Sequence, residues 1–483
     1  MNKYIKNYFL SVSNTLMMLI FPIITFPYVS RVLGPSPLGV IYFAQSYGYY
    51  FIHLANFGIT SYAIREVSRV RDDPARVEIT SNEIFNLNIF FSIISTALYF
   101  TGVLFVQNFR DNFLIFALYS VVILSDFLTL DWLLMSYDDY LFSTVRNLIV
   151  RLLALISVFA FVRDKDDYVI YMAIICVSEM GIKFSALIYC RKKYARLRFS
   201  NVFLNFKDHI KPMFTLFSYR LVGGISTNLD KIMIGFMLVY ASVGVYSAGI
   251  KIAVMLQVAV ETIGVVMFPR INISADSSKD DYLKCLKLNY NLILLMGIPM
   301  TVGLFLISGR LIPLFAGEEY YGSIAVSRIM VMVILLGPIG DMIGSKILLV
   351  HKKDNWLLYC SLISTAANVI LNCIFIPLYG INGAAFASLI GYVVSFLTRY
   401  LFAVRLVKIR LITKGLLKYS LFTLPFVLIY CFLRVPISTD NVYMFSFVAV
   451  CATIYAAELI ISKDSAAREV IDRLFKNKRL SNI

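Results

Sequence analysis

The segment YVIYMAIICVSEMGIKFSALIYC (168–190), followed at once by RKKYARLRFSNVFLNFKDHIK (191–211), decides the fold of this chain. The first part is long enough to cross the ~30 Å hydrocarbon core of a bilayer as one helix. The second part holds seven Lys and Arg residues, and short loops rich in these residues stay on the cytoplasmic side. The same alternation of apolar run and polar gap recurs along the chain, so the sequence predicts an all-α polytopic membrane protein.

The composition agrees with this prediction. Of the 483 residues, 59% are hydrophobic and 15% are charged, whereas a soluble domain carries about 25% charged residues. Barrel strands are not expected, because the apolar runs do not alternate with polar residues. The net charge of +16 is spread over many short connections. It therefore favours a topology signal and attraction to anionic membrane lipids over nucleic-acid binding.

We predict about 14 transmembrane helices. On this division, about 31 of the 45 Lys and Arg residues fall on the side that holds both termini, and about 6 fall on the other side. By the positive-inside rule both termini are cytoplasmic. The predicted spans are 8–30, 39–62, 86–107, 113–134, 146–162, 168–190, 213–239, 243–268, 289–309, 323–350, 355–378, 382–404, 416–433 and 441–462.

A weak internal repeat suggests two halves. LGVIYFA (38–44) resembles VGVYSAG (243–249) at an offset of 205 residues, although chance similarity in a biased sequence is the alternative. A parallel repeat fits two six-helix lobes around a central cavity. We therefore expect an N-lobe with its basic cytoplasmic linker over 1–211 and a C-lobe over 212–415. Two further helices and an amphipathic cytoplasmic tail fill 416–483.

A few charged residues lie inside the predicted spans. Arg220 is deep in span 213–239, and Asp230 follows about 15 Å further along the same helix. Arg151 and Lys251 lie inside two other spans. Because intramembrane ions usually face an interior or a water path, we interpret Arg220 as an anion binder. A structural ion pair to another span is the alternative.

Other charges in the spans have local explanations. Glu179 and Lys183 have the i,i+4 spacing of a local ion pair. Arg146, Lys346 and Arg399 fall near cytoplasmic ends of spans, where long cationic side chains snorkel to the interface.

Asn368 and Asn372 also have i,i+4 spacing, in span 355–378. Two amides on one helix face either hydrogen-bond a neighbouring helix or offer oxygen ligands to a cation. The seven Cys residues show no CxxC pair, and the three His are scattered, so no metal site or disulfide framework is expected. No phosphate-binding GxxxxGK[ST] loop or catalytic set appears. The sequence therefore predicts no enzyme and no cofactor, and a transporter driven by Na⁺ or H⁺.

Three long segments resemble one known family. They are FPIITFPYVSRVLGPSPLGVIYFAQS (21–46) with LANFGITSYAIREVSRVRDD (54–73), STNLDKIMIGFMLVYASVGVYSAGIKI (226–252) with VVMFPRI (265–271), and NVILNCIFIPLYGINGAAFAS (368–388). They are similar to Wzx-type polysaccharide flippases of the multidrug/oligosaccharidyl-lipid/polysaccharide exporter superfamily. The resemblance spans nearly the whole chain except the last two spans and the tail.

This resemblance implies alternating access by two six-helix lobes in the bacterial cytoplasmic membrane. It also implies a cargo, an undecaprenyl-diphosphate-linked glycan moved from the inner to the outer leaflet for O-antigen, capsule or teichoic acid. Polysaccharide polymerase machinery is an implied partner. A diphosphate in a low-dielectric cavity needs cations, and the Arg fork suits phosphate oxygens. The expected anion-binding residues are Arg220, Lys251 and Arg151, with Arg31, Arg65 and Arg270 at the cavity mouths.

In the related lipid II flippases, an acid in span seven and a polar pair in span eleven help to bind sodium. Asp230, Asn368 and Asn372 occupy what look like matching positions. Those relatives also carry arginines midway along span one, whereas here span one has none before Arg31. This departure puts lipid II handling in doubt.

Two other functions are alternatives for this sequence. A drug or organic-cation antiporter of the same superfamily would need acids in its cavity, and the candidate cavity residues here lean basic. A membrane-embedded glycan polymerase or ligase usually carries a large outer loop. The outer gaps of this chain are short, such as 240–242 and 380–383, which argues against that class.

Overall fold

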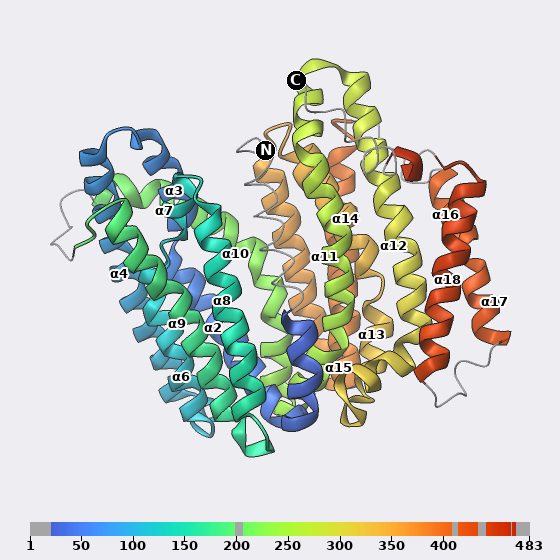
Figure 1. The fold of residues 1–483 in the computed structure, drawn as a ribbon, viewed down its shortest axis with the longest axis horizontal. Coiled ribbons are helices and arrows are strands. Elements are labelled where there is room, and N and C mark those ends of the chain that lie inside the picture. Colours follow the sequence, from blue (N-terminus) through green and yellow to red (C-terminus); the bar gives the residue numbers. More distant parts are fainter. Residues whose placement is uncertain (1–20, 199–205, 408–413, 433–440, 465, 470–483) are drawn as a thin grey trace. The chain divides into compact units, whose positions relative to one another are not determined.

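The computed structural model describes residues 21–198, 206–407, 414–432, 441–464 and 466–469 (Figure 1). Within these ranges the side chains of 206–208, 215, 216, 218–227 and 276 lie outside the description. All regular elements in the described ranges are helices, and no strand occurs among them. The predicted all-α fold is therefore confirmed.

The first half of the chain contains short helices between long ones. In order, they are an unlabelled helix Phe21–Leu33, α2 (Pro35–Asn56), α3 (Ile59–Val70), α4 (Pro74–Phe105), α5 (Gln107–Arg110), α6 (Phe113–Leu124), η1 (Ser125–Leu128), α7 (Asp131–Ser136), α8 (Tyr140–Phe161), η2 (Lys165–Asp167), α9 (Tyr168–Lys193) and α10 (Phe206–Met237).

The second half of the chain also contains short helices between long ones. Its elements are α11 (Tyr240–Ser277), α12 (Lys279–Ala316), η3 (Glu318–Tyr320), α13 (Ser323–Met330), α14 (Val333–Ile343), the π-helical turn η4 (Gly344–Leu348), α15 (Asp354–Ala403), α16 (Lys414–Phe422), α17 (Leu424–Phe432) and α18 (Asn441–Ile461).

Ten helices in the described ranges are long and apolar enough to cross a membrane. One of them, α15, joins two helices across a kink at Gly380, whose φ of 58° belongs to the left-handed region that favours glycine. This kink separates the predicted spans 355–378 and 382–404. The chain is thus a multi-pass membrane protein, and the count of fourteen spans stays a prediction.

Several predicted spans contain a break in the helix. Span 39–62 is divided because Phe57 (φ 41°) and Gly58 (φ 78°) adopt left-handed conformations, which end α2 at Asn56. Span 113–134 is divided between α6 and α7, with η1 and a short irregular segment between them. Span 323–350 consists of α13, α14 and η4. Each break leaves backbone groups that other residues must satisfy.

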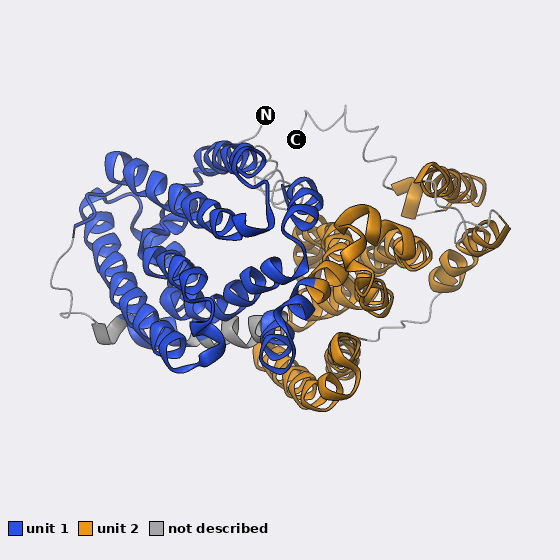
Figure 2. Cartoon of the chain, turned by 90° about the horizontal axis from the view of Figure 1, so that it is seen from below, with its two compact units in different colours: residues 1–244 blue, residues 245–483 orange. Residues whose placement is uncertain are grey.

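The chain forms two compact units, residues 1–244 and 245–483 (Figure 2). Within the first unit, the beginnings of α2 and α11 approach each other at two equivalent glycines. A Cβ on Gly39 would overlap the Tyr240 carbonyl oxygen, and a Cβ on Gly244 would overlap the Pro35 carbonyl oxygen. The two glycines are related by the 205-residue offset of the repeat, and so are the residues that they approach, Pro35 and Tyr240. The predicted repeat therefore corresponds to a reciprocal backbone contact.

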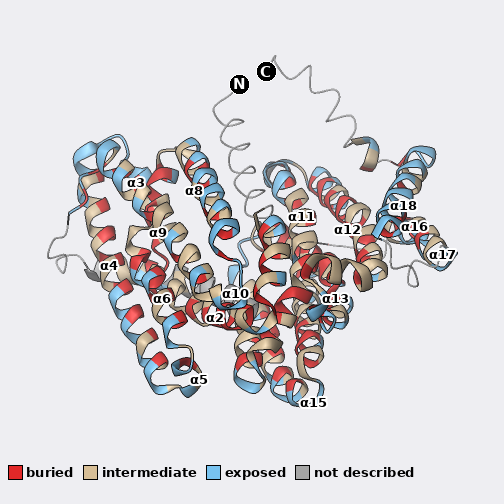
Figure 3. Cartoon of the chain, turned by 60° about the horizontal axis from the view of Figure 1, so that its bottom comes forward, coloured by how far each residue is buried: buried red, intermediate tan, exposed pale blue. Residues whose placement is uncertain are grey.

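Many large apolar residues are exposed, including Phe105, Val177, Phe432 and Ile461. Figure 3 shows that exposed positions occur along many of the helices. Such an apolar exterior suits lipid rather than water. A separate buried cluster in the first unit joins α3, α4 and α7 to residues of the basic linker, with Trp132 and Leu197 among its members. Each unit therefore has an interior of its own in addition to its apolar exterior.

Candidate functional site

Arg151 on α8 is the predicted anion-binding residue whose surroundings the structure describes most fully. Its guanidinium carbon lies 5.8 Å from the centre of the Phe21 ring. Its Nε is buried and has no hydrogen-bond partner in the described part of the chain. The helix Phe21–Leu33 is held beside α8 by the Tyr28 hydroxyl, which donates to the Val162 carbonyl oxygen at 2.7 Å. Arg151 thus has an N–H group to which an anion could accept a hydrogen bond.

Asp230 lies in a polar contact between α10 and α2. It is buried and close enough to Tyr50 and Lys231 to interact electrostatically with both. Nearby, the Asn228 side-chain oxygen accepts hydrogen bonds from Ser46 at 3.4 Å and from Lys231 at 3.2 Å. The Lys231 ammonium therefore places a positive charge beside the acid predicted to bind a cation.

Asn368 and Asn372 are fully buried in the second unit. The Asn372 amide donates to the Asn368 oxygen at 3.2 Å, and the Asn368 amide donates to the Ser388 hydroxyl at 3.3 Å. The Ser388 hydroxyl also lies 3.5 Å from the Tyr246 hydroxyl of α11. These bonds join the two arms of α15 and reach α11, as the helix-packing alternative predicts. Asp230 belongs to the first unit, whereas the two asparagines belong to the second.

The remaining predicted residues differ in their surroundings. Arg65 is exposed over the Tyr62 ring and pairs with Glu66 at 2.9 Å. Arg270 is exposed and pairs with Glu469 at 3.0 Å. Arg31 is exposed and Lys251 is half-buried. The Arg220 side chain lies outside the described residues. Acids thus already hold Arg65 and Arg270.

Three expectations about intramembrane charges were wrong. Lys183 pairs with Asp126 at 3.5 Å rather than with Glu179. Arg146 does not snorkel, because it is buried and donates to Asp131 at 2.8 Å.

Lys346 is likewise buried, and its Nζ lies 2.6 Å from Asp341. In each case a buried cation found an acid that spacing on one helix face did not indicate. The low cost of pairing compared with burying a lone charge explains the outcome.

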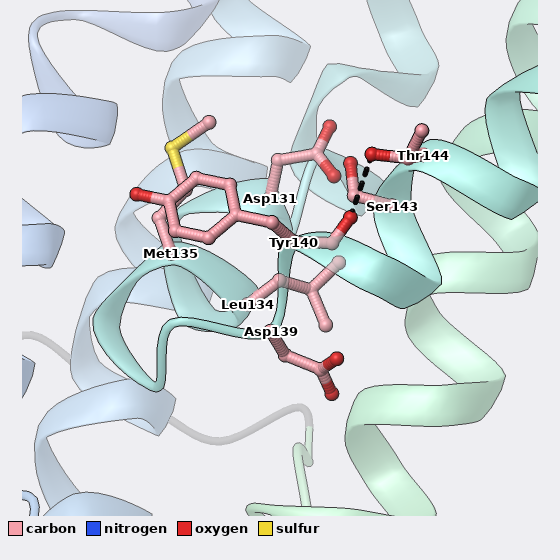
Figure 4. A pocket seen from close by; sticks show the side chains of 7 residues that line it. All are labelled: Asp131, Leu134, Met135, Asp139, Tyr140, Ser143 and Thr144. Carbon is pink, nitrogen blue, oxygen red and sulfur yellow. Dashed lines mark hydrogen bonds between the residues drawn. The ribbon is translucent and has the colours of Figure 1, made fainter. Parts of the chain in front are cut away.

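The acids of the segment between α6 and α8 also surround a small pocket of about 50 Å³ (Figure 4). In the close-up Asp131 lies on one side of it and Asp139 on the other. Asp139 accepts hydrogen bonds from Lys193 at 2.8 Å and from Tyr189 and Tyr194 at 2.7 Å. The lining residues are Asp131, Leu134, Met135, Asp139, Tyr140, Ser143 and Thr144.

Burial would raise the pKa of the Asp139 carboxyl, but the hydrogen bonds to it outweigh burial and lower the pKa to about 2. Asp139 is therefore a permanent anion at neutral pH, fully occupied by its own donors. The pocket is too small for a glycan, so it is part of the scaffold of the first unit rather than a cargo site.

Comparison with known proteins supplies the family. The model of the family "Polysaccharide biosynthesis protein" matches residues 4–275. A curated protein of Escherichia coli (strain K12), "Putative O-antigen transporter", is 23% identical over 342 residues, which cover 69% of this chain and 81% of that protein.

Two solved structures share the fold. The lipid II flippase MurJ in an inward closed conformation has a TM-score of 0.79 at 17% identity, covering 96% of this chain and all of that one. An inward-facing multidrug resistance MATE family transporter has a TM-score of 0.60 at 12% identity, covering 79% of this chain and 93% of that one. These relatives are transporters rather than enzymes. The chain belongs to the polysaccharide biosynthesis protein family, as a Wzx-type member of the multidrug/oligosaccharidyl-lipid/polysaccharide exporter superfamily.

Proposed function

We propose that this chain flips undecaprenyl-diphosphate-linked oligosaccharide repeat units from the inner to the outer leaflet of the bacterial cytoplasmic membrane. The observation that carries the proposal is membership of a polysaccharide biosynthesis family together with similarity to an O-antigen transporter. The similarity in fold to a lipid II flippase supports a lipid-linked cargo. The product would serve synthesis of O-antigen or another surface polysaccharide, such as capsule or teichoic acid.

The cargo is an anion attached to a long apolar tail, and the chain offers matching chemistry. Arg151 has a buried N–H donor beside an aromatic ring, with no acceptor among the described residues. A guanidinium with a free N–H suits a phosphate oxygen. We assign Arg220, Lys251 and Arg151 to the diphosphate, and Arg31, Arg65 and Arg270 to the approach. The apolar exterior accommodates the polyprenyl tail in the surrounding lipid.

The transport cycle that we propose is alternating access by an N-lobe (1–211) and a C-lobe (212–415), with the helices of 416–483 outside them. Both termini face the cytoplasm, where the basic loops meet anionic lipids and, as a further partner, the polymerase machinery. A Na⁺ or H⁺ gradient drives the cycle. Asp230 and the amides Asn368 and Asn372 are the residues proposed for cation coupling.

The test is flipping in proteoliposomes that contain a labelled undecaprenyl-diphosphate oligosaccharide. We expect protein-dependent arrival of the label in the opposite leaflet and a 10- to 100-fold loss in Arg151→Gln. That range corresponds to about 1.5–3 kcal/mol for one hydrogen bond to a charged group. Arg76→Gln is the matched control, because Arg76 is exposed and pairs with Asp73 on the surface. A folded Arg151→Gln protein with wild-type flipping would remove Arg151 from the site.

The second candidate is an organic-cation antiporter, and the similarity in fold to a multidrug resistance MATE family transporter supports it. It differs in the charge that its cavity must offer. Export of organic cations in the same vesicles, without flipping of several lipid-linked glycans, would favour it over the flippase.

A further inference from the structure

Four helical elements of the second unit meet around a charged cluster that the proposed function does not use. Glu261 comes from α11, Asp341 from α14, Lys346 from η4 and Arg399 from the second arm of α15. A Cβ on Gly264 of α11 would lie 2.8 Å from the Lys346 ammonium. Glycine at this position lets the α11 backbone approach the ion pair closely.

One acid of the cluster, Asp341, forms an ion pair with the Lys346 ammonium. Lys346 Nζ lies 2.6 Å from Asp341 Oδ2 and 2.9 Å from the Ser345 hydroxyl. The Lys346 backbone is held as well, because the Tyr282 hydroxyl donates to its carbonyl oxygen at 2.7 Å. Since η4 is a π-helical turn, Lys346 emerges at a different angle than an α-helix would give it. Asp341 and Lys346 therefore form a fixed ion pair.

The other acid has an amide as its partner. Gln257 lies one turn earlier on α11, and its Nε2 donates to Glu261 Oε1 at 2.8 Å. In the described part of the chain, no cation forms an ion pair with Glu261. Asp341, Lys346 and Arg399 are the charged groups that act on it through space. Glu261 is thus a half-buried carboxyl that feels the charge of a second acid, Asp341, whose counter-ion is already engaged.

The Gln257 side chain has a hydrogen-bond acceptor that a protonated carboxyl could satisfy. Its Oε1 is buried and has no hydrogen-bond donor in the described part of the chain. A Cβ on Gly337 of α14 would overlap the Gln257 amide, so glycine there leaves the space that the amide fills. A carboxylate has no proton to give to this oxygen, whereas a carboxylic acid has one.

We propose that Glu261 is a proton-binding site and that it forms a cyclic acid–amide pair with Gln257. The amide N–H donates to one Glu261 oxygen, and the proton on the other Glu261 oxygen is donated to Gln257 Oε1. Both side chains are then satisfied, and the membrane interior holds no uncompensated carboxylate. Release of this proton leaves Glu261 as an anion, which attracts Lys346 or Arg399 and so changes the packing of α11 against α14.

A metal ion fits this position less well than a proton. Among the described residues, Gln257 is the one that hydrogen-bonds the carboxylate, so its carbonyl is the oxygen at hand for a metal ion, and the Lys346 ammonium already neutralises the neighbouring acid. A monovalent cation would need more oxygen ligands and would be repelled by the two cationic side chains. The proposal concerns proton binding itself and does not depend on which cargo the protein carries.

The test is infrared spectroscopy of the reconstituted full-length protein at neutral pH, with hydrogen–deuterium exchange to identify the carbonyl band of protonated carboxyl groups. We expect such a band in the wild type and its loss in Glu261→Gln. The variant keeps the shape of the pair, and its fold is checked by size exclusion and thermal melting. Glu179→Gln, which changes another intramembrane glutamate of the first unit, is the matched control and should keep the band.

A second variant tests the pair itself. Gln257→Leu removes the amide while keeping Glu261, so the band should remain but shift to higher frequency as the carbonyl loses its hydrogen bond. Absence of the band in the wild type, or its survival in a folded Glu261→Gln protein, would overturn the proton site. An unshifted band in Gln257→Leu would overturn the acid–amide pair.

Discussion

Removal of the Lys183 ammonium tests how much the first unit depends on this cation, which lies at the end of α6 beside the buried acid Asp126. Lys183 on α9 donates to the Val122 carbonyl oxygen at 2.9 Å and lies 3.5 Å from Asp126. Val122 is in the last turn of α6, where the chain leaves the helix and carbonyl groups need new donors. Asp126 itself is almost fully buried, and Asn88 donates to its backbone carbonyl at 3.3 Å. One ammonium therefore satisfies both a helix end and a buried acid.

The cost of Lys183→Met can be worked from these contacts. Breaking a buried ion pair by removal of one partner costs about 3–5 kcal/mol. A ceiling follows from the option that Asp126 takes up a proton instead. For a carboxyl that starts from an ordinary pKa of about 3.9, this step costs about 4 kcal/mol at pH 7 and about 1.5 kcal/mol at pH 5. Lys183→Met should therefore be most destabilising at neutral pH.

The assay is reversible unfolding in mixed micelles at pH 7 and pH 5. We expect Lys183→Met to lose about 4 kcal/mol at pH 7 and clearly less at pH 5. Adding Asp126→Asn should recover much of the loss, because no buried charge then remains. Lys192→Met, at an exposed position of the same helix, is the control and should stay within about 0.5 kcal/mol of wild type. An equal loss at both pH values, without rescue by Asp126→Asn, would refute the reasoning.

Three further predictions concern the scaffold. Gly39→Leu should force the beginnings of α2 and α11 apart, so it should lower the melting temperature and the yield of monodisperse protein; wild-type behaviour would show that the close approach is dispensable. Because hydrogen bonds from Lys193 and two tyrosines lower the pKa of Asp139 to about 2, its stabilisation is complete above about pH 4 and lost as the pH falls towards 2. Asp139→Asn should therefore melt below wild type at pH 6 and approach it near pH 2, and parallel melting curves would contradict this. Asp464 accepts from Lys418 at 2.6 Å and caps the segment after it, so Asp464→Ala should make the tail more sensitive to limited proteolysis; an unchanged digestion pattern would argue against the cap.

The positions of the membrane-crossing helices were predictable from the sequence, because apolar length is a direct physical requirement of the bilayer. The breaks inside them were not. The stretch from Ser125 to Leu130 contains the polar residues Ser125, Asp126 and Thr129, but the span around it stays apolar on average, so hydropathy alone does not show that the backbone leaves the α-helix here. The break after Asn56 had a weak signal in Gly58, yet Phe57 also takes a left-handed conformation there. Tertiary contacts, rather than local composition, decide where these helices end.

The partners of buried charges were even harder to predict from the sequence. Spacing along one helix can indicate only i,i+3 and i,i+4 pairs. It therefore favoured Glu179 for Lys183, although the actual acid, Asp126, is 57 residues away in the chain. The Gln257–Glu261 bond does have i,i+4 spacing and was open to detection. Its sequence signal is weak, because an amide four residues from an acid is common on helices and does not show whether the pair is buried.

The described intramembrane charges divide into those that are satisfied within the protein and those that are not. Lys183 and Lys346 each have an acid within the same unit, and such pairs secure helix breaks without leaving a net charge. Arg151 and Glu261 are different, since Arg151 keeps an unused buried N–H and Glu261 has only an amide. The Arg151 N–H suits an anion, and the Glu261 carboxyl suits a proton. If both ligands favour the same conformation of the transporter, binding of one strengthens binding of the other by the same factor, because such coupling is reciprocal. On the proposed function, protonation of Glu261 would then strengthen binding of the anionic cargo without any contact between the two ligands.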